Sequence, residues 1–231
     1  MLMSHPQIQH LAIIMDGNRR WAKDKGKSAT FGHKAGYERM KEIGDWCLDR
    51  GIPYLTVFAF STENWQRTEQ EVGFLMDLFE DALTKELESF HKKGVRMRVI
   101  GQRERLRPSI LRAIENAEEL TKNNTASTFS ICFNYGGRPE IVDAVKKLIS
   151  EGRDAESIDE AALQSAMYFP EMPDPDLIVR TSGEERLSGF LLWQSAYSEL
   201  YWTNKHWPDF DEAELDKALE TFALRQRRFG K

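Results

Sequence analysis

The sequence predicts an α/β fold: a single domain over residues 1–231 with a central, mostly parallel six-stranded sheet flanked by helices. Strand-like and helix-like runs alternate along the whole chain, which is the pattern of a parallel sheet with crossover helices on its faces. The strand-like runs are continuously apolar, as expected for strands that are covered on both faces. With 231 residues, of which 41% are hydrophobic, the chain is long enough to bury one sizeable core.

Six short apolar runs are the expected strands. Each is bounded by polar or turn-forming residues, which separates it from the helix-like segments on either side. The strands are expected at residues 10–15, 54–60, 95–100, 128–133, 176–180 and 199–202.

The helix-like segments fill the intervals between these strands. In residues 34–49, Tyr37, Met40 and Ile43 recur at helical spacing, and Gly51 ends the run. Further helices are expected at residues 69–92, 108–121, 139–150, 157–168 and 211–228.

The segment 69–92 is the longest expected helix and carries a wide apolar stripe. Core packing explains such a stripe, and the alternative is that part of it lines a deep apolar pocket together with Ala59. The stripe consists of Val72, Phe74, Leu75, Met76, Leu78, Phe79, Ala82, Leu83, Leu87 and Phe90.

Composition narrows the class of protein. A net charge of −5 argues against a nucleic-acid partner, which usually selects a basic protein. The two cysteines, Cys47 and Cys132, lie in apolar segments and are expected to be buried thiols in a reducing compartment. The sequence contains no run of about 18 apolar residues, so no membrane span is expected. Residues 1–10 do not resemble a signal peptide. We therefore expect a cytoplasmic protein.

The first expected strand runs directly into Asp16, Gly17, Asn18, Arg19 and Arg20. The glycine allows a ligand to approach the backbone closely, and the asparagine is a plausible helix cap. Arginines at a helix start suit phosphate, and a carboxylate in the same place suits Mg²⁺. A capped turn followed by a solvated basic helix would explain this stretch equally well if it stood alone.

Polar segments also follow the other strands. Because parallel strands end at one edge of a sheet, these connectors are expected to converge on one site. Arginines on the connectors would bind phosphate oxygens, although each arginine alone could form a surface ion pair. The connectors are Ser61–Arg67, Gly101–Arg103, Asn134–Arg138 and Arg180–Ser188.

Two further residues leave alternatives open. His33 is either an ordinary residue at a helix start, a phosphate ligand or a proton shuttle. Glu199 begins an apolar strand and needs a partner, so it either forms an ion pair at the edge of the sheet or binds a metal ion.

Most known phosphate and hydrolase motifs are absent. Gly26-Lys27-Ser28 imitates the end of a P-loop, but Trp21 occupies the position of the required glycine. No G-x-G-x-x-G, D-D-x-x-D or G-x-S-x-G pattern occurs, and no Ser-His-Asp arrangement is apparent.

Several motifs together resemble the cis-prenyltransferases, and among them the undecaprenyl diphosphate synthases. The resemblance covers the chain from about residue 10 to residue 230, with the motifs in the same order and spacing. The motifs are Met15-Asp16-Gly17-Asn18-Arg19-Arg20-Trp21-Ala22, Gly32-His33, Ala59 to Arg67, Arg180-Thr181-Ser182-Gly183-Glu184-x-Arg186-x-Ser188, Phe190 to Gln194 and Glu199-Leu200.

The resemblance implies a Mg²⁺-dependent transferase of prenyl groups. Such an enzyme condenses isopentenyl diphosphate repeatedly, with cis geometry, onto an allylic diphosphate. The expected starter is farnesyl diphosphate. The expected product is a polyprenyl diphosphate such as undecaprenyl diphosphate, a cell-wall lipid carrier. It also implies a homodimer, and Arg228-Phe229-Gly230 resembles a tail that crosses the dimer interface. Product chain length and peripheral contact with a membrane stay open.

The family's functional residues carry over by position. The resemblance makes Asp16 the acid that places Mg²⁺ on diphosphate, Glu199 a second metal ligand and Asn64 an assistant in proton removal. It assigns isopentenyl diphosphate to Arg180, Arg186 and Ser188. The allylic substrate and other substrate contacts fall to Gly17, Asn18, Arg19, Arg20, Trp21, His33, Ser61, Thr62, Glu63, Trp65 and Arg67.

Two positions depart from the family pattern. Many bacterial members have glycine where this chain has Arg19, and an arginine is usual where it has Ala29. Our hypothesis is that Arg19 or Lys27 supplies the missing charge at the allylic diphosphate.

Two competing functions predict different residues. A non-catalytic partner subunit would lack the metal-binding acid or the arginines, yet Asp16, Asn64, Arg180 and Glu199 are all present. A phosphohydrolase with an aspartate nucleophile typically has a second acid two positions away, where this chain has Ile14.

Overall fold

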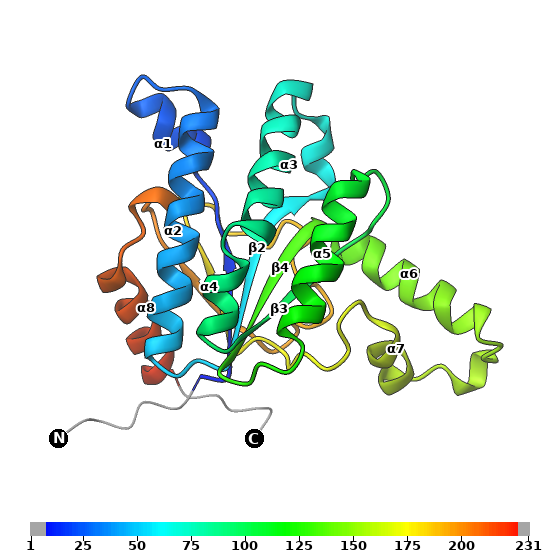
Figure 1. Ribbon diagram of the computed structural model, residues 1–231. Helices are drawn as coiled ribbons and strands as arrows, with labels where there is room; N and C mark the ends of the chain where they lie inside the picture. Colours follow the sequence, from blue (N-terminus) through cyan, green and yellow to red (C-terminus); the bar gives the residue numbers. More distant parts are fainter. Residues whose placement is uncertain (1–7, 226–231) are drawn as a thin grey trace.

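The computed structural model describes residues 8–225 and confirms the α/β fold with a six-stranded sheet (Figure 1). All strand pairs are parallel, in the order β3-β4-β2-β1-β5-β6. The tail at Arg228–Gly230 lies outside the described residues. The strands are β1 (His10–Ile14), β2 (Tyr54–Ser61), β3 (Val95–Ile100), β4 (Ser127–Tyr135), β5 (Leu177–Arg180) and β6 (Glu199–Trp202).

Helices occupy the intervals between the strands, as expected. The α-helices are α1 (Asn18–Asp24), α2 (Ala29–Asp49), α3 (Glu69–Thr84), α4 (Leu87–Lys92), α5 (Pro108–Thr121), α6 (Gly137–Ser150), α7 (Glu160–Ala166) and α8 (Glu212–Leu224). Short 3₁₀ helices are η1 (Thr62–Gln66), η2 (Ala155–Ser157) and η3 (Trp207–Asp209).

The prediction of one continuous helix over residues 69–92 is wrong, because the segment breaks between α3 and α4. At the break, Glu86 turns toward α2, where its carboxylate lies 3.2 Å from Lys41 Nζ and accepts a hydrogen bond from the Tyr37 hydroxyl. Apolar spacing continues across the break, so the sequence pattern alone does not reveal it.

The helices divide unequally between the two faces of the sheet (Figure 1). The face toward α2, α3, α4, α5 and α8 carries the larger buried cluster, in which Ile13, Val57 and Ile131 of three strands meet the helices. The opposite face carries a smaller cluster, completed by Phe169, Phe190 and other residues of irregular segments. The stripe of α3 therefore faces a thick apolar layer.

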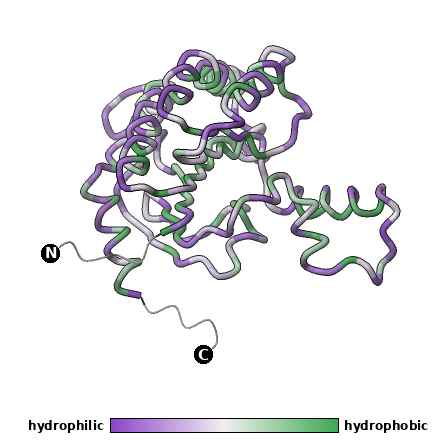
Figure 2. The backbone as a smooth tube through the Cα atoms, turned by 60° about the horizontal axis from the view of Figure 1, so that its bottom comes forward, coloured by the Kyte–Doolittle hydropathy of each residue, from purple (hydrophilic) through white to green (hydrophobic). Residues whose placement is uncertain are grey.

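The α6–α7 pair forms an arm that projects from the rest of the molecule (Figure 2). Ala144, Leu148 and Ala166 give the arm its own small apolar cluster. On α6, Val142 is 50% exposed and Ile149 is 62% exposed. The arm thus presents apolar surface that the described residues of this chain do not cover.

Both cysteines are buried, as predicted. Burial raises the pKa of the Cys47 thiol to about 12 and holds that of Cys132 well above its ordinary value.

Within residues 8–225, no helix combines the length and the apolar character needed to cross a bilayer.

Candidate active site

The carboxyl ends of four neighbouring strands meet at one edge of the sheet, because all strands are parallel. Asp16, Ser61, Gly136 and Arg180 follow or end β1, β2, β4 and β5, and all four line one cavity. The expectation that the connector after β3 joins them is wrong. Gly101–Arg103 does not line this cavity, because β3 is the outermost strand of the sheet and β4 separates it from β2.

Asp16 lies between two guanidinium groups. Its Oδ2 accepts a hydrogen bond from Arg180 Nη2 at 2.8 Å, and its Oδ1 lies 3.1 Å from Arg20 Nη2. The Thr181 hydroxyl bridges the Asp16 backbone, accepting from its N–H at 2.9 Å and donating to its carbonyl oxygen at 2.6 Å. Burial raises the pKa of the Asp16 carboxyl, but Arg180 and Arg20 together lower it below its ordinary value. The site therefore holds a fixed carboxylate anion.

Arg180 draws the segment after β5 into the site. Its side chain is 5% exposed, and its Nη1 donates to the Ser188 hydroxyl at 2.9 Å and to the Arg186 carbonyl oxygen. Its Nε is buried without a hydrogen-bond partner in the structure. Ser182 and Ser188 both have left-handed backbone, with φ of 79° and 50°. Strained residues of this kind concentrate at functional sites.

The turn between β1 and α1 lines the cavity at the start of a helix, where the first backbone N–H groups have no partner within the helix. Gly17 has a φ of 104° and forms the N-cap of α1, so the prediction of Asn18 as the cap is wrong. Instead, Asn18 packs against Gly36 of α2, and its Oδ1 is buried without a partner. Helix N–H groups beside Arg19 and Arg20 would suit an anion.

Glu71 joins three of the predicted substrate-binding residues, and sequence reasoning missed it. Its carboxylate lies 2.9 Å from His33 Nε2, 3.0 Å from Arg67 Nη1 and 3.8 Å from Arg19 Nε. Burial lowers the pKa of His33 by more than the Glu71 hydrogen bond raises it, which favours a neutral imidazole. Burial raises the pKa of Glu71, but His33 and the two arginines lower it overall.

The 3₁₀ helix η1 places Asn64 in the cavity wall. The Ser61 backbone N–H donates to Asn64 Oδ1 at 3.1 Å, and the Ser61 side chain accepts from the Asn64 backbone. Glu63 also lines the cavity. Thr62 and Trp65 lie beside it and do not line it; the Trp65 indole donates to Asn134 Oδ1 at 2.7 Å.

Two other predicted contacts lie outside the cavity wall. The Trp21 ring stacks on Phe31 at 5.8 Å and its Nε1 donates to Asp209 Oδ1 at 2.7 Å. The Arg186 guanidinium pairs with Glu184, so only its backbone carbonyl contacts Arg180.

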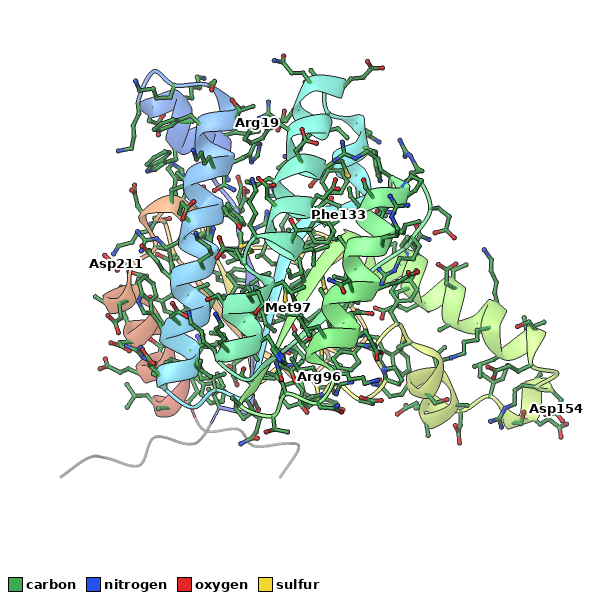
Figure 3. All side chains as sticks on the ribbon, viewed as in Figure 1. Arg19, Arg96, Met97, Phe133, Asp154 and Asp211 are labelled. Carbon is green, nitrogen blue, oxygen red and sulfur yellow. The ribbon has the colours of Figure 1, made fainter. Side chains whose placement is uncertain are left out.

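The cavity has a volume of about 1100 Å³ and joins a charged mouth to an apolar interior. This exceeds the usual upper range of about 1,000 Å³ for a small-molecule pocket. Figure 3 shows Arg19 high beside the space between α2 and α3, and Phe133 lower, at the sheet. The expected lining by Ala59 and part of the α3 stripe is confirmed. The apolar lining includes Ala59, Tyr37, Met40, Leu75, Leu78, Phe79, Ala82, Ile131, Phe133 and Leu192.

Arg138 and Lys27 also line the mouth of the cavity. Arg138 ends the predicted connector after β4, and no sequence motif separates it from the other arginines of the connectors. Ala29 lines the same cavity as Lys27 and Arg19, the two candidate replacements for the missing arginine.

The donor set fits a magnesium ion that is shared with a phosphate ligand. Among residues 8–225, no three His, Cys, Asp or Glu side chains form a group able to hold a metal. Mg²⁺ usually binds through one or two carboxylates, waters and substrate phosphates, not through an all-protein cage. Asp16 is one such carboxylate, in a cavity whose cations suit phosphate.

Glu199, which the resemblance makes a second metal ligand, does not lie beside Asp16 within one chain. Glu199 opens β6 and pairs with Leu177 at the start of β5. Leu177 is three residues before Arg180, and a strand rises by roughly 3.3 Å per residue, so Glu199 lies about 10 Å along the strand direction from the level of Arg180. Its carboxylate accepts a hydrogen bond from Arg225 Nη1 at 2.7 Å instead.

Comparisons with known proteins identify the family of this chain. A family model described as "Putative undecaprenyl diphosphate synthase" matches residues 14–230. An isoprenyl transferase of Neisseria gonorrhoeae is 49% identical over 231 residues, covering 100% of this chain and 92% of that protein. One of Thermotoga maritima is 50% identical over 225 residues, covering 96% of each.

Solved structures share the fold. Lavandulyl diphosphate synthase from Lavandula x intermedia, in complex with dimethylallyl diphosphate, has a TM-score of 0.92 at 37% identity and covers 97% of this chain and 99% of its own. A probable undecaprenyl diphosphate synthase from Campylobacter jejuni has a TM-score of 0.82 at 34% identity with the same coverage. The chain therefore belongs to the undecaprenyl diphosphate synthase family of cis-prenyltransferases.

Proposed function

We propose that this isoprenyl transferase condenses isopentenyl diphosphate sequentially onto farnesyl diphosphate to give a long-chain polyprenyl diphosphate such as undecaprenyl diphosphate. The observation that carries the proposal is the continuity of the cavity. One space of about 1100 Å³ joins a carboxylate and several guanidinium groups to an apolar interior. Such a space suits a ligand with a polyanionic head and a long hydrocarbon chain.

The two substrate diphosphates have separate sites in this proposal. The allylic diphosphate binds at the N–H groups that begin α1, with Arg19 and Arg20 beside it. The isopentenyl diphosphate binds at Arg180 and Ser188, which a 2.9 Å hydrogen bond holds together. Because Asp16 contacts both Arg20 and Arg180, it lies between the two sites.

Asp16 is the residue that would hold Mg²⁺. When bound, the ion supplies Lewis-acid stabilisation of the charge on the departing diphosphate. Arg19, Arg20 and the helix N–H groups stabilise the same charge as the allylic C1–O bond breaks. The apolar walls exclude water from the carbon centre that isopentenyl diphosphate attacks, which protects it from hydrolysis.

Asn64 is placed to assist the loss of the C2 proton that completes the condensation. An amide is not itself a base, so its role is to orient the groups involved. The hydrogen bond from the Ser61 backbone fixes its side-chain oxygen, and the whole turn is anchored to β2. We expect diphosphate oxygens to accept the proton.

We further propose that two copies of the chain associate through the α6–α7 arm. The exposed Val142 and Ile149 side chains on α6 support this proposal. An apolar surface of this kind usually marks a contact with another protein.

The test is incorporation of radiolabelled isopentenyl diphosphate into extractable product, with farnesyl diphosphate and Mg²⁺ present. We expect a ladder of products that differ by five carbons. Release of phosphate without incorporation would show a phosphohydrolase. Neither reaction, under conditions where a relative from Neisseria gonorrhoeae elongates, would show a non-catalytic partner subunit.

A further inference from the structure

A serine, a histidine and an aspartate from three separate segments meet beneath the turn that begins α1. The Ser182 hydroxyl and His206 Nδ1 are 2.5 Å apart, and His206 Nε2 lies 3.5 Å from Asp24 Oδ2. A neutral imidazole with its proton on Nε2 satisfies both contacts, since the hydroxyl then donates to Nδ1. The three residues come from the segment after β5, the segment after β6 and the end of α1.

This group does not have the geometry of a hydrolase triad. In such a triad the imidazole faces serine with Nε2 and the acid with Nδ1, which is the reverse of the arrangement here. Ser182 is also only 7% exposed, and Asp24 has a side chain that is 69% exposed. The group therefore calls for a role other than nucleophilic catalysis.

The backbone of Ser182 indicates that its hydroxyl has a purpose. Ser182 has a φ of 79°, a left-handed conformation that glycine adopts without cost and other residues adopt with strain. The next residue, Gly183, shares this conformation with a φ of 75°. A serine in such a strained conformation suggests that its side chain has a role. The contact that the hydroxyl makes is with His206.

The serine–histidine pair supports the loop that begins α1. A Cβ atom added at Gly17 would lie 2.5 Å from Ser182 Oγ and 2.7 Å from His206 Nδ1, so the pair lies directly against that glycine. The Ser182 carbonyl oxygen accepts a hydrogen bond from Arg20 Nη1 at 3.3 Å, and Arg20 in turn contacts Asp16. Movement of Ser182 would thus displace both the loop backbone and an arginine of the allylic site.

We propose that His206 is a positioning residue for the allylic diphosphate site, acting through the Ser182 hydroxyl. The inference rests on the proposed function, because it assigns the loop at Gly17 to the allylic substrate. His206 holds Ser182 in its strained conformation, and Ser182 holds Gly17 and Arg20 where a diphosphate meets them. The Asp24 carboxylate orients the imidazole and ties the end of α1 to the same point.

The experiment compares three variants by steady-state kinetics, with each substrate varied separately. His206→Leu removes both polar contacts. His206→Asn places an amide where Nδ1 was and restores the contact with Ser182. Ser182→Gly removes the hydroxyl and relieves the strain. We expect His206→Leu and Ser182→Gly to raise the KM for farnesyl diphosphate about tenfold, the effect of losing one well-placed hydrogen bond.

Three readouts separate positioning from a general loss of structure. His206→Asn is expected to return the KM for farnesyl diphosphate to within about threefold of the parent value. The KM for isopentenyl diphosphate and kcat are expected to change less than the KM for farnesyl diphosphate. Ser182→Gly is expected to keep or raise the melting temperature, because glycine suits this φ.

An unchanged KM for farnesyl diphosphate in both Ser182→Gly and His206→Leu would overturn the inference. So would a parallel loss of kcat, both KM values and melting temperature, which would show a structural role only. If the parent chain does not elongate at all, the proposed function fails. Calorimetric binding of farnesyl diphosphate to the parent and the same variants then still tests whether His206 positions the loop.

Discussion

The carboxylate of Asp16 is held by Arg180 at 2.8 Å and lies 3.1 Å from Arg20, and its backbone is fixed by Thr181. These contacts determine both its charge and its direction. A carboxylate with two cationic neighbours stays ionised well into the acid range, because its pKa is lowered. Asp16 is thus a carboxylate anion near neutral pH.

Replacement of Asp16 tests the metal proposal. Asp16→Asn keeps the size of the side chain and removes its charge, so we expect incorporation of isopentenyl diphosphate to fall at least about 10³-fold, comparable with the loss of a principal electrostatic group. Chelation of divalent cations in the parent enzyme should abolish incorporation, and added Mg²⁺ should restore it. Asp45→Asn, which breaks a surface pair with Lys93, is the matched control. Full activity in Asp16→Asn would contradict the proposal.

Glu71 is a site residue that the sequence could not reveal. Its partners His33 and Arg19 lie on other helices, and only the packing of α3 against α2 brings them within 4.0 Å. Asp16, Arg180 and Ser61 could be predicted, because a residue at the end of a parallel strand has a defined place. The same reasoning places Glu199, the first residue of a parallel strand, at the end of the sheet away from Asp16 within one chain.

Glu71→Gln is expected to destabilise the fold by about 3 kcal/mol at pH 7, because it leaves His33, Arg67 and Arg19 without their shared anion. The pKa of Glu71 is lower in the folded protein than its ordinary value of 4.5. Its contribution to stability is therefore fully present above about pH 4.5 and is lost as the pH falls through the lower folded pKa. The difference in unfolding free energy between the parent and the variant should shrink in that window.

Denaturant unfolding at pH 7 and below pH 4 measures this difference. Glu69→Gln, an exposed change on the same helix, is the control and should have little effect at either pH. A difference that is constant with pH would show that Glu71 acts through packing and not through charge.

At the scale of elements, α3 forms one wall of the cavity. Leu75, Leu78, Phe79 and Ala82 of this helix line the apolar interior, and the Phe79 ring stacks on Phe133 of β4 at 3.7 Å. Periodicity predicted the stripe but not which part of it meets empty space. That depends on the distance between α2 and α3, and no pattern within one helix encodes that distance.

Ala82→Phe is expected to shorten the products, because the larger side chain occupies cavity that the growing chain would enter. The cost in stability should be under about 1.5 kcal/mol, since the ring can extend into open volume. Reversed-phase chromatography of labelled products measures chain length. Gly73→Ala is the control on the same helix, because a Cβ there meets nothing within 4 Å. An unchanged product distribution in Ala82→Phe would show that the chain does not pass this residue.

At the scale of the whole molecule, the parallel sheet collects the candidate site at one edge. Composition and alternation predicted this arrangement, and the bounds of β3, β6 and α5 agree with the predicted ranges. The helix break at Glu86 could not be predicted, because the apolar spacing continues across it and the contact of Glu86 with Lys41 joins residues far apart in sequence. The projecting arm could not be predicted either, since a helix that covers a neighbour and one that extends outward can share the same amphipathic pattern.

The arm provides a test of assembly. We expect the parent chain to elute as a dimer in size-exclusion chromatography with light scattering, and Ile149→Asp to shift it toward monomer. A charge placed in an apolar interface is left without a partner, which makes association unfavourable. Leu120→Asp, at a residue that is 38% exposed on α5, is the control. A dimer that persists in Ile149→Asp would place the interface elsewhere.

The burial of Cys47 and Cys132 has a practical consequence. Both are buried, and their raised pKa values disfavour the thiolate, which is the reactive form. Maleimide reagents would therefore find no native target in the folded enzyme. Cysteines introduced at Lys25 and Glu69, both exposed, would become the labelling positions for a donor and acceptor fluorophore. Single-molecule energy transfer between them would then report the distance between α1 and α3 while the enzyme works.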